Sequence, residues 1–260
     1  MQTSSGRWAR GTRIALTIVS IVVIQTGVCG LAALPVLVAA SHLIAAIESV
    51  TLGAVVAAVI LVPAYAVFAL GLMMWSALAS RLLGLRTPEN AQLPIAAMSW
   101  DLMRWVQYVV AMHVVRVLAG FLYRGSPIWS WYLRLNGARV GRGVYVNSVF
   151  LSDHNLLELG DGVVIGADVH LSGHTVERGI LKTSRVRIAA GATIGVGSVV
   201  EIGAEIGPRC QIGALSFVPK FATLPGDSVY AGIPVRRLDR PAKEDAGASR
   251  ARAEAAVPGA

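Results

Sequence analysis

The residues best suited to chemistry stand where a regular pattern in the sequence is interrupted. The segment Ser172–Arg185 contains His174 and, three positions later, Glu177. A neutral imidazole accepts a proton near pH 7, and general-base help of this kind accelerates a reaction by about 10²–10⁴-fold. Glu177 could orient the imidazole or bind an amine. His154 is the next candidate, whereas His170 belongs to the regular part of the pattern and is expected to be structural.

The pattern itself is a repeat of six residues. Aliphatic side chains stand six apart without a break at Ile188, Ile194, Val200, Ile206, Ile212, Val218 and Leu224, and a small residue follows each of them four positions later. Hexapeptide repeats are the signature of a parallel β-helix, in which three units close one triangular coil. The aliphatic residue then points to the axis and the small residue to a narrow corner. Cys210 occupies such a corner, so we expect it to pack there.

Two interruptions of this scaffold are expected to carry function, because loops that leave a rigid framework commonly do so. The segment Ser152–Glu158 adds one residue to the frame, and Ser172–Arg185 is a longer departure. After Leu224 the sequence LPGDSVYAGIPVRRL is expected to form the last coil and its cap.

The composition of the N-terminal part indicates a membrane protein. The chain has 260 residues, of which 55% are apolar and 15% charged, against about 25% charged residues in a typical soluble domain. Ile14–Ala40 and Ser49–Ser80 are apolar and long enough to span, since about 20 helical residues cross a bilayer. They predict a helical hairpin. The first stretch is about twice as long as the apolar region of a signal peptide.

Basic residues set the expected orientation of this hairpin. Arg10 and Arg13 precede the first span, Arg81 and Arg86 follow the second, and the short connection has no Lys or Arg. The positive-inside rule therefore places both ends in the cytoplasm. The net charge of +8 is explained by this topology, and no recognition motif for nucleic acid accompanies it. Two cysteines give neither a disulfide framework nor a metal site.

These observations divide the chain into four parts: a two-span hairpin (1–87), an interfacial amphipathic and aromatic segment (88–136), a β-helix (137–238) and a disordered tail (239–260). Within the second part, Ala96–Tyr123 mixes apolar residues with charges and with several Trp and Tyr side chains, which suits the membrane–water interface. A third full span is the alternative.

The β-helical part resembles the hexapeptide-repeat acyltransferases. The matching segments are RLNGARVGRGVYVNS, LLELGDGVVIGADVHLSGH, the repeats from Ile188 to Leu224 and SVYAGIPVRR. Together with the two spans, GSPIWSWYLRLNGARVG and HTVERG resemble a narrower group. This group is the membrane-embedded C-terminal region of polylysine-synthetase-type nonribosomal peptide synthetases. The resemblance implies an all-β left-handed parallel β-helix after the helical membrane hairpin, a homotrimer, and acyl-donor clefts between neighbouring β-helices.

The resemblance also implies roles for particular residues. It makes His174 the general base and places Asn147 and Asp153 near the acceptor. His154, which directly follows Asp153, is counted with them as a predicted substrate-binding residue. The resemblance places the pantetheine and phosphates of the acyl-CoA donor, most simply acetyl-CoA, at residues of the C-terminal coils: Gly213, Ala214, Ser216, Lys220, Arg236 and Arg237. One departure is that Thr193-Ile194-Gly195 stands where many soluble members have Trp-Ile-Gly.

The leading hypothesis is a membrane-anchored acyltransferase of the inner membrane, multi-pass, with its catalytic domain in the cytoplasm. It would transfer an acyl group from a phosphopantetheine thioester to a hydroxyl or amine of an amphiphilic acceptor, without a metal. Two alternatives remain. In the first, an aminoacyl or peptidyl carrier protein is the donor. In the second, the chain is a non-catalytic trimeric membrane scaffold.

Overall fold

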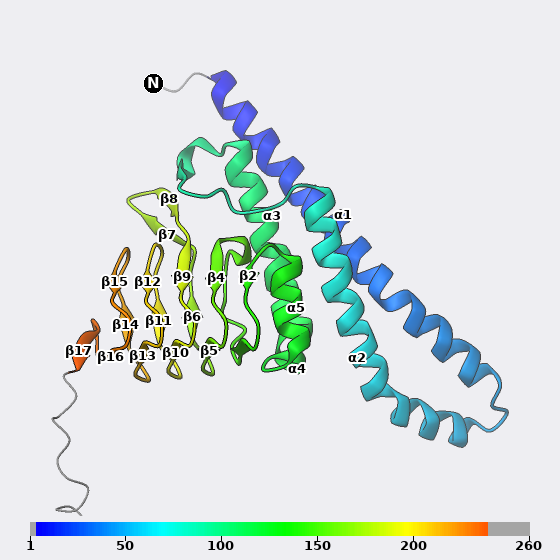
Figure 1. The fold of residues 1–260 in the computed structure, drawn as a ribbon. Coiled ribbons are helices and arrows are strands. Elements are labelled where there is room, and N and C mark those ends of the chain that lie inside the picture. The colour runs from blue at the N-terminus through cyan, green and yellow to red at the C-terminus, as the bar shows by residue number, and fades with distance from the viewer. Residues whose placement is uncertain (1–3, 239–260) are drawn as a thin grey trace, which may run out of the picture.

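The computed structural model describes residues 4–238 and consists of a helical layer followed by a β-helix (Figure 1). The two longest helices, α1 (Ser4–Ala45) and α2 (Val50–Leu82), run antiparallel as a hairpin. Ser49 caps α2, and its side chain accepts a hydrogen bond from the Leu52 amide. The predicted tail, 239–260, lies outside the described residues.

Shorter elements connect the hairpin to the β-helix. They are β1 (Gln92–Pro94), the 3₁₀ turn Ile95–Ala97, α3 (Trp100–Val115), a π-helical turn (Arg116–Gly120), α4 (Phe121–Tyr123) and α5 (Pro127–Leu135). Ser99 and Ser126 cap α3 and α5 in the same way as Ser49 caps α2. Pro127 is the first residue of α5. Its lack of an N–H costs no hydrogen bond there, because the first N–H groups of a helix have no acceptor within the helix.

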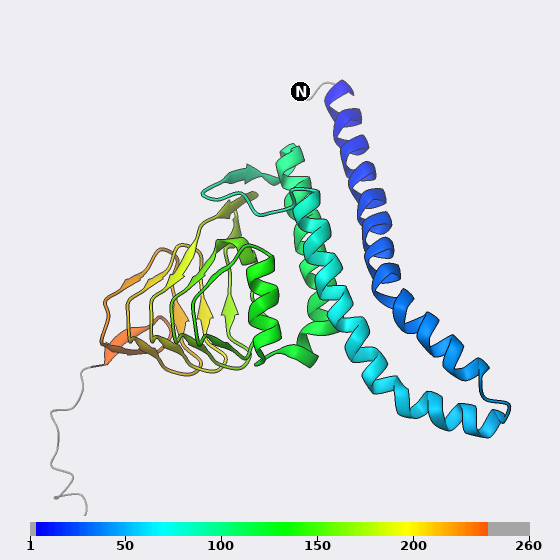
Figure 2. The same cartoon turned by 45° about the vertical axis from the view of Figure 1, so that its right-hand side comes forward.

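Three helical stretches are long and apolar enough to cross a membrane: Arg10–Ala45, Val50–Leu82 and Trp100–Tyr123. The third is the most enclosed of the three. In its most apolar stretch 33% of the residues are buried, against 11% in each of the other two. It lies between the hairpin and the β-helix (Figure 2). The structure thus adds a third apolar helix to the predicted hairpin, and the choice between an interfacial and a spanning segment stays a prediction.

The β-helix has three parallel faces. The first contains β2 (Arg139–Val140), β4 (Leu157–Leu159), β9 (Val186–Ile188), β12 (Glu205–Ile206) and β15 (Thr223–Leu224). The second contains β3 (Tyr145–Val146), β5 (Val164–Ile165), β10 (Thr193–Ile194), β13 (Gln211–Ile212) and β16 (Val229–Ala231), closed by the antiparallel β17 (Arg236–Leu238). The third contains β6 (His170–Leu171), β11 (Val199–Val200) and β14 (Phe217–Val218).

The register of these strands confirms the six-residue repeat. Thr193 pairs with Gln211, which is 18 positions or three units further along the chain. The aliphatic residues from Ile188 to Val218 are at most 3% exposed, and the corner residue Cys210 is fully buried. Because each buried aliphatic side chain contributes about 1.5–3 kcal/mol, the stacked axis holds the coils together. The predicted fold class, apolar helices followed by a parallel β-helix, is confirmed.

Helix α5 closes the first coil and joins the two parts of the molecule. Trp129, Tyr132 and Leu133 on this helix are at most 1% exposed. The Trp129 indole N–H donates to the carbonyl oxygen of Ser148 at 2.9 Å. Val115 of α3 belongs to the same buried cluster. The helices are therefore packed onto the end of the β-helix and fix its position.

The long interruption of the repeat is a β-hairpin. Strands β7 (His174–Glu177) and β8 (Ile180–Thr183) pair antiparallel, and β1 from the helical part adds a third strand, with Gln92 opposite Lys182. Figure 1 shows this hairpin at the top of the coils, below the segment that precedes α3. A segment that the sequence marks as a loop is thus held on two sides.

Candidate active site

The topology of the β-helix brings Asp153 and His174 together. Leu151 and Leu171 pair on the third face, in successive coils. Asp153 follows the first of them by two positions, and His174 follows the second by three, so both leave the same corner one coil apart. Asp153 has a left-handed backbone, with φ of 52°. The added residue and the long departure in the repeat therefore meet at one place.

The two side chains form a hydrogen-bonded pair. His174 Nδ1 lies 2.5 Å from Oδ2 of Asp153, with the imidazole N–H donating to the carboxylate. The Asp153 side chain is fully buried, whereas that of His174 is 25% exposed. With Nδ1 committed to this bond, the lone pair of Nε2 is the one that a neutral imidazole keeps for a proton.

The second oxygen of Asp153 is held by the helical part of the molecule. Oδ1 accepts from the Thr87 hydroxyl at 2.6 Å and from the Trp105 indole N–H at 3.1 Å. The Trp105 ring also meets the His174 ring edge to face, with centroids 5.0 Å apart. The carboxylate is thus satisfied on both oxygens, and the imidazole is fixed by contacts on two sides.

These contacts set the protonation states of the pair. Burial alone would raise the pKa of Asp153, but the hydrogen bonds from His174, Thr87 and Trp105 and the charge of His174 lower it overall. Burial alone would lower the pKa of His174, but Asp153, by hydrogen bond and by charge, and the charge of Glu201 raise it above its ordinary value. Asp153 is therefore ionised at neutral pH and favours the imidazolium that forms when His174 takes up a proton.

Sequence reasoning missed Thr87 and Trp105. They lie 66 and 48 positions before Asp153, in the part of the chain that the sequence assigns to the membrane and its interface. In the sequence, Trp105 is one of several aromatic residues on an apolar segment, and nothing distinguishes it from the others. Nothing in the pattern around Thr87 marks it as a partner of a carboxylate.

Glu177 faces two lysines rather than the imidazole. Its carboxylate accepts from Lys182 at 2.9 Å on the hairpin and from Lys220, which lies after β14. These two hydrogen bonds lower the pKa of Glu177 to about 2. The partner that orients His174 is Asp153, so the structure gives that task to a residue that the sequence reasoning placed with the acceptor. Lys220 is correspondingly tied to the hairpin.

Among the described residues, neither of the two other predicted acceptor residues has a side-chain hydrogen bond to the pair. Asn147 follows β3 and so occupies the corner between the second and third faces, where it is half-buried. His154 is buried beneath α5, with its ring edge to face on Tyr132 at 5.6 Å. Burial lowers the pKa of His154 to about 4. The structure thus encloses His154 in the core beside the site.

The predicted donor residues lie on the C-terminal coils. Gly213, Ala214 and Ser216 form the turn between β13 and β14, and the Ser198 hydroxyl donates to the Gly213 carbonyl at 2.9 Å. Arg236 and Arg237 are exposed on β17. The structure leaves the side chains of both arginines accessible to a ligand.

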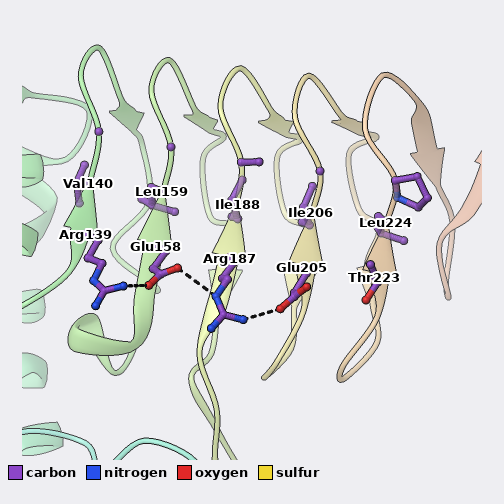
Figure 3. Close-up of a pocket in the computed structure, with 15 residues that line it drawn as sticks. Arg139, Val140, Glu158, Leu159, Arg187, Ile188, Glu205, Ile206, Thr223 and Leu224 are labelled. Carbon is purple, nitrogen blue, oxygen red and sulfur yellow. Dashed lines mark hydrogen bonds and ion pairs between the residues drawn. The ribbon is translucent and has the colours of Figure 1, made fainter.

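A separate groove of about 850 Å³ lies on the first face of the β-helix (Figure 3). Charged side chains alternate along it: Glu158 and Arg187 are 3.1 Å apart, and Arg187 and Glu205 are 2.5 Å apart. Its lining consists of residues from the five strands of that face and the turns that follow them. His174 is not among them, so this groove is distinct from the Asp153–His174 pair.

Comparison with known proteins found similarities to part of the chain. No family model matches. Delta-poly-L-ornithine synthetase from Acinetobacter baumannii (strain AB307-0294) is 25% identical over 139 residues, which are 54% of this chain and 10% of that protein. The chain therefore spans about a tenth of the length of this curated relative.

Solved structures with a likeness to the chain include two acetyltransferases. A hexapeptide-repeat acetyltransferase from Vibrio cholerae O1 biovar eltor, solved with acetyl coenzyme A, is 23% identical, with a TM-score of 0.37. The match covers 40% of this chain and 60% of that one. A maltose O-acetyltransferase from Clostridium difficile 630 is 19% identical, with a TM-score of 0.41 and coverage of 53% and 88%.

Proposed function

We propose that this protein is a membrane-anchored acyltransferase with His174 as its general base. The observation that carries the proposal is the pair of His174 with the buried, fully hydrogen-bonded Asp153 at a corner of the β-helix. A histidine whose Nδ1–H is held by a carboxylate has the tautomer that accepts a proton on Nε2. Asp153 comes from the β-helix, whereas Thr87 and Trp105 reach it from the helical part, so residues of both parts hold the pair in place.

The transfer proceeds by direct attack on a thioester. The acceptor's O–H or N–H lies against His174 Nε2, which takes the proton as the oxygen or nitrogen bonds to the thioester carbonyl carbon. The carbon–sulfur bond then breaks, and the leaving thiolate receives the proton from the imidazolium. Asp153 stabilises the imidazolium between these two steps, and Trp105 limits the movement of the ring.

The donor in this proposal is an acyl-CoA, and acetyl-CoA is the simplest member of the class. The exposed Arg236 and Arg237 supply cations that suit its phosphates. The turn of Gly213, Ala214 and Ser216 would lie along its pantetheine by shape, since the Gly213 and Ser216 amides already donate to the Tyr230 carbonyl and the Ser198 hydroxyl. We further propose a homotrimer, and an orientation with the β-helix in the cytoplasm. The basic residues at the end of α2 support this orientation.

The match to Delta-poly-L-ornithine synthetase favours a second candidate with the same residues. Its name describes a protein that joins ornithine units, and such a reaction transfers an aminoacyl group to an amine. In that case a carrier protein presents the thioester instead of coenzyme A. His174 would still take the proton, so the two candidates differ in donor and not in base.

The test is turnover of acetyl-CoA by the full-length protein in detergent, with a panel of amphiphilic alcohols and amines as acceptors. The His174→Ala substitution should lower kcat by about 10²–10⁴-fold, because it removes the general base. His170→Ala is the matched control, since His170 is an exposed histidine of the same coil whose ring stacks on Phe150. Wild-type turnover in His174→Ala would contradict the role of His174. No turnover by any variant, wild type included, would favour the non-catalytic scaffold.

A further inference from the structure

A second polar cleft lies between the helical layer and the first coils, and Arg139 is the one residue that it shares with the groove on the first face. It has a volume of about 980 Å³, and it is lined by the end of α2, the segment that follows, the start of α3 and the first coils. The arginines that line it are Arg81, Arg86, Arg104, Arg139 and Arg185, and the carboxylates are those of Glu89 and Asp101. The lining is therefore predominantly cationic.

The arginines differ in how they are used. Arg185 is bonded to Glu89 at 2.6 Å and 2.9 Å, and Arg139 is paired with Glu158. Within residues 4–238, Arg86 and Arg104 form no ion pair, and both are exposed. Two guanidinium groups, one from the segment after α2 and one from α3, thus line one cleft without an ion pair of their own, which is an arrangement that suits a phosphate.

The position of the cleft selects the kind of phosphate. Helix α2 is apolar up to Ser80, and Arg81 begins the basic stretch that follows. Leu82 and Leu83 are 77% and 50% exposed beside the cleft residues Arg81 and Gly84, and Trp100 is 52% exposed beside Asp101. Apolar side chains next to a cationic cleft at the end of a membrane helix match an amphiphile, with its chains against apolar surface and its head among the arginines.

We propose that this cleft binds the headgroup of an anionic phospholipid, with Arg86 and Arg104 as its phosphate ligands. Thr87, which lies between Arg86 and Pro88 in the lining, donates to Asp153. The bound lipid would therefore sit on the segment that holds the catalytic pair. The binding does not require the proposed transfer, so its failure and the failure of the acyltransferase proposal are separate results.

The test measures, by calorimetry, the binding of soluble short-chain lipids to the full-length protein in a zwitterionic detergent. Dihexanoyl phosphatidylglycerol should bind more tightly than dihexanoyl phosphatidylcholine. The double substitution Arg86→Gln/Arg104→Gln should weaken phosphatidylglycerol binding by at least about tenfold, because each arginine supplies a charge-assisted contact. Arg142→Gln/Arg178→Gln is the matched control, since it removes the same charge from two exposed arginines outside the cleft.

Further arms distinguish the sources of the phosphate and guard against misfolding. Arg86→Lys/Arg104→Lys keeps the charge and should restore part of the affinity, with all variants unfolding at the wild-type temperature. Equal binding of phosphatidylglycerol by the cleft and control variants would overturn the proposal. It would also be overturned if coenzyme A or inorganic phosphate displaced the lipid at equal concentration, since the cleft would then belong to a free phosphate compound.

Discussion

In the proposed reaction, the groups on the Nδ1 side of His174 leave Nε2 as the atom that takes up the proton. Asp153 is buried, ionised and held by Thr87 and Trp105, so it cannot turn away from the imidazole. The same interaction raises the pKa of His174. A raised pKa makes the ring a stronger proton acceptor but leaves less of it neutral at a given pH. Asp153 therefore has two opposite effects on the rate: it increases the basicity of His174, and it decreases the fraction of His174 that is neutral at a given pH.

The raised pKa of His174 predicts the pH dependence of the proposed reaction. In the wild type, kcat/KM should rise with pH as His174 loses its proton, with a midpoint above the ordinary histidine value of about 6.5. Asp153→Asn removes the negative charge, so the pKa of His174 falls and the midpoint moves to lower pH. The maximal rate should also fall by about tenfold or more, because the imidazolium loses its stabilising charge.

The measurement is a pH–rate profile of both proteins with the same acceptor. Thr87→Val tests the same chain of contacts one step further away, and its midpoint should move less than that of Asp153→Asn. Identical profiles for wild type and Asp153→Asn would contradict the assigned role of the pair.

Among the elements, the hairpin β7–β8 decides whether His174 stays in place. It leaves the coils, and β1 pairs with it from the helical side. Beneath it lies a small apolar cluster in which Leu181 is fully buried against Leu102 and Met103 of α3, with Trp105 packed on the same cluster. The hairpin and α3 therefore pack together through this one cluster, which also includes Trp105, the residue that donates to Asp153.

Leu181→Ala should weaken this shared core. Truncation of a fully buried leucine costs about 2–5 kcal/mol, because it loses buried surface and leaves a cavity. We expect a lower unfolding temperature in detergent and a lower kcat, since His174 and Trp105 lose support together. Val176→Ala on the same hairpin is the control: Val176 is 52% exposed, so its truncation should change both quantities little. An effect of equal size in both variants would argue against the cluster.

At the scale of the whole molecule, the two parts demand different surroundings. The hairpin exposes many large apolar side chains, among them Val22, Leu37 and Val59, which are 59%, 64% and 71% exposed. The first face of the β-helix carries the charges Glu158, Arg187 and others (Figure 3), which would be costly in hydrocarbon. We therefore expect the helices to associate with a membrane and the β-helix to stay outside the hydrocarbon layer.

Ligand-linked stability tests the donor for the whole protein. A donor present at 100 times its Kd should stabilise the folded state by about 2.7 kcal/mol, provided that it binds only this state. We expect acetyl-CoA to raise the unfolding temperature of the full-length protein, and Arg236→Gln/Arg237→Gln to reduce this rise. Comparison with free coenzyme A and longer acyl-CoAs separates the contribution of the acyl group. No shift with any of them would favour a carrier protein as donor.

The coils could be predicted from the sequence alone, because the six-residue spacing is local and every unit has an aliphatic residue for the axis and a small residue for the corner. The sequence also predicts the two longest helices, since a long uncharged stretch has few other stable forms. It marked the segments that contain Asp153 and His174, as interruptions of a regular frame.

The arrangement of these two segments follows from tertiary packing. Thr87 and Trp105 reach Asp153 from far earlier in the chain, and α5 encloses His154 while the hairpin leaves His174 partly open. Such long-range packing leaves no period in the sequence, so it could not be predicted from spacing.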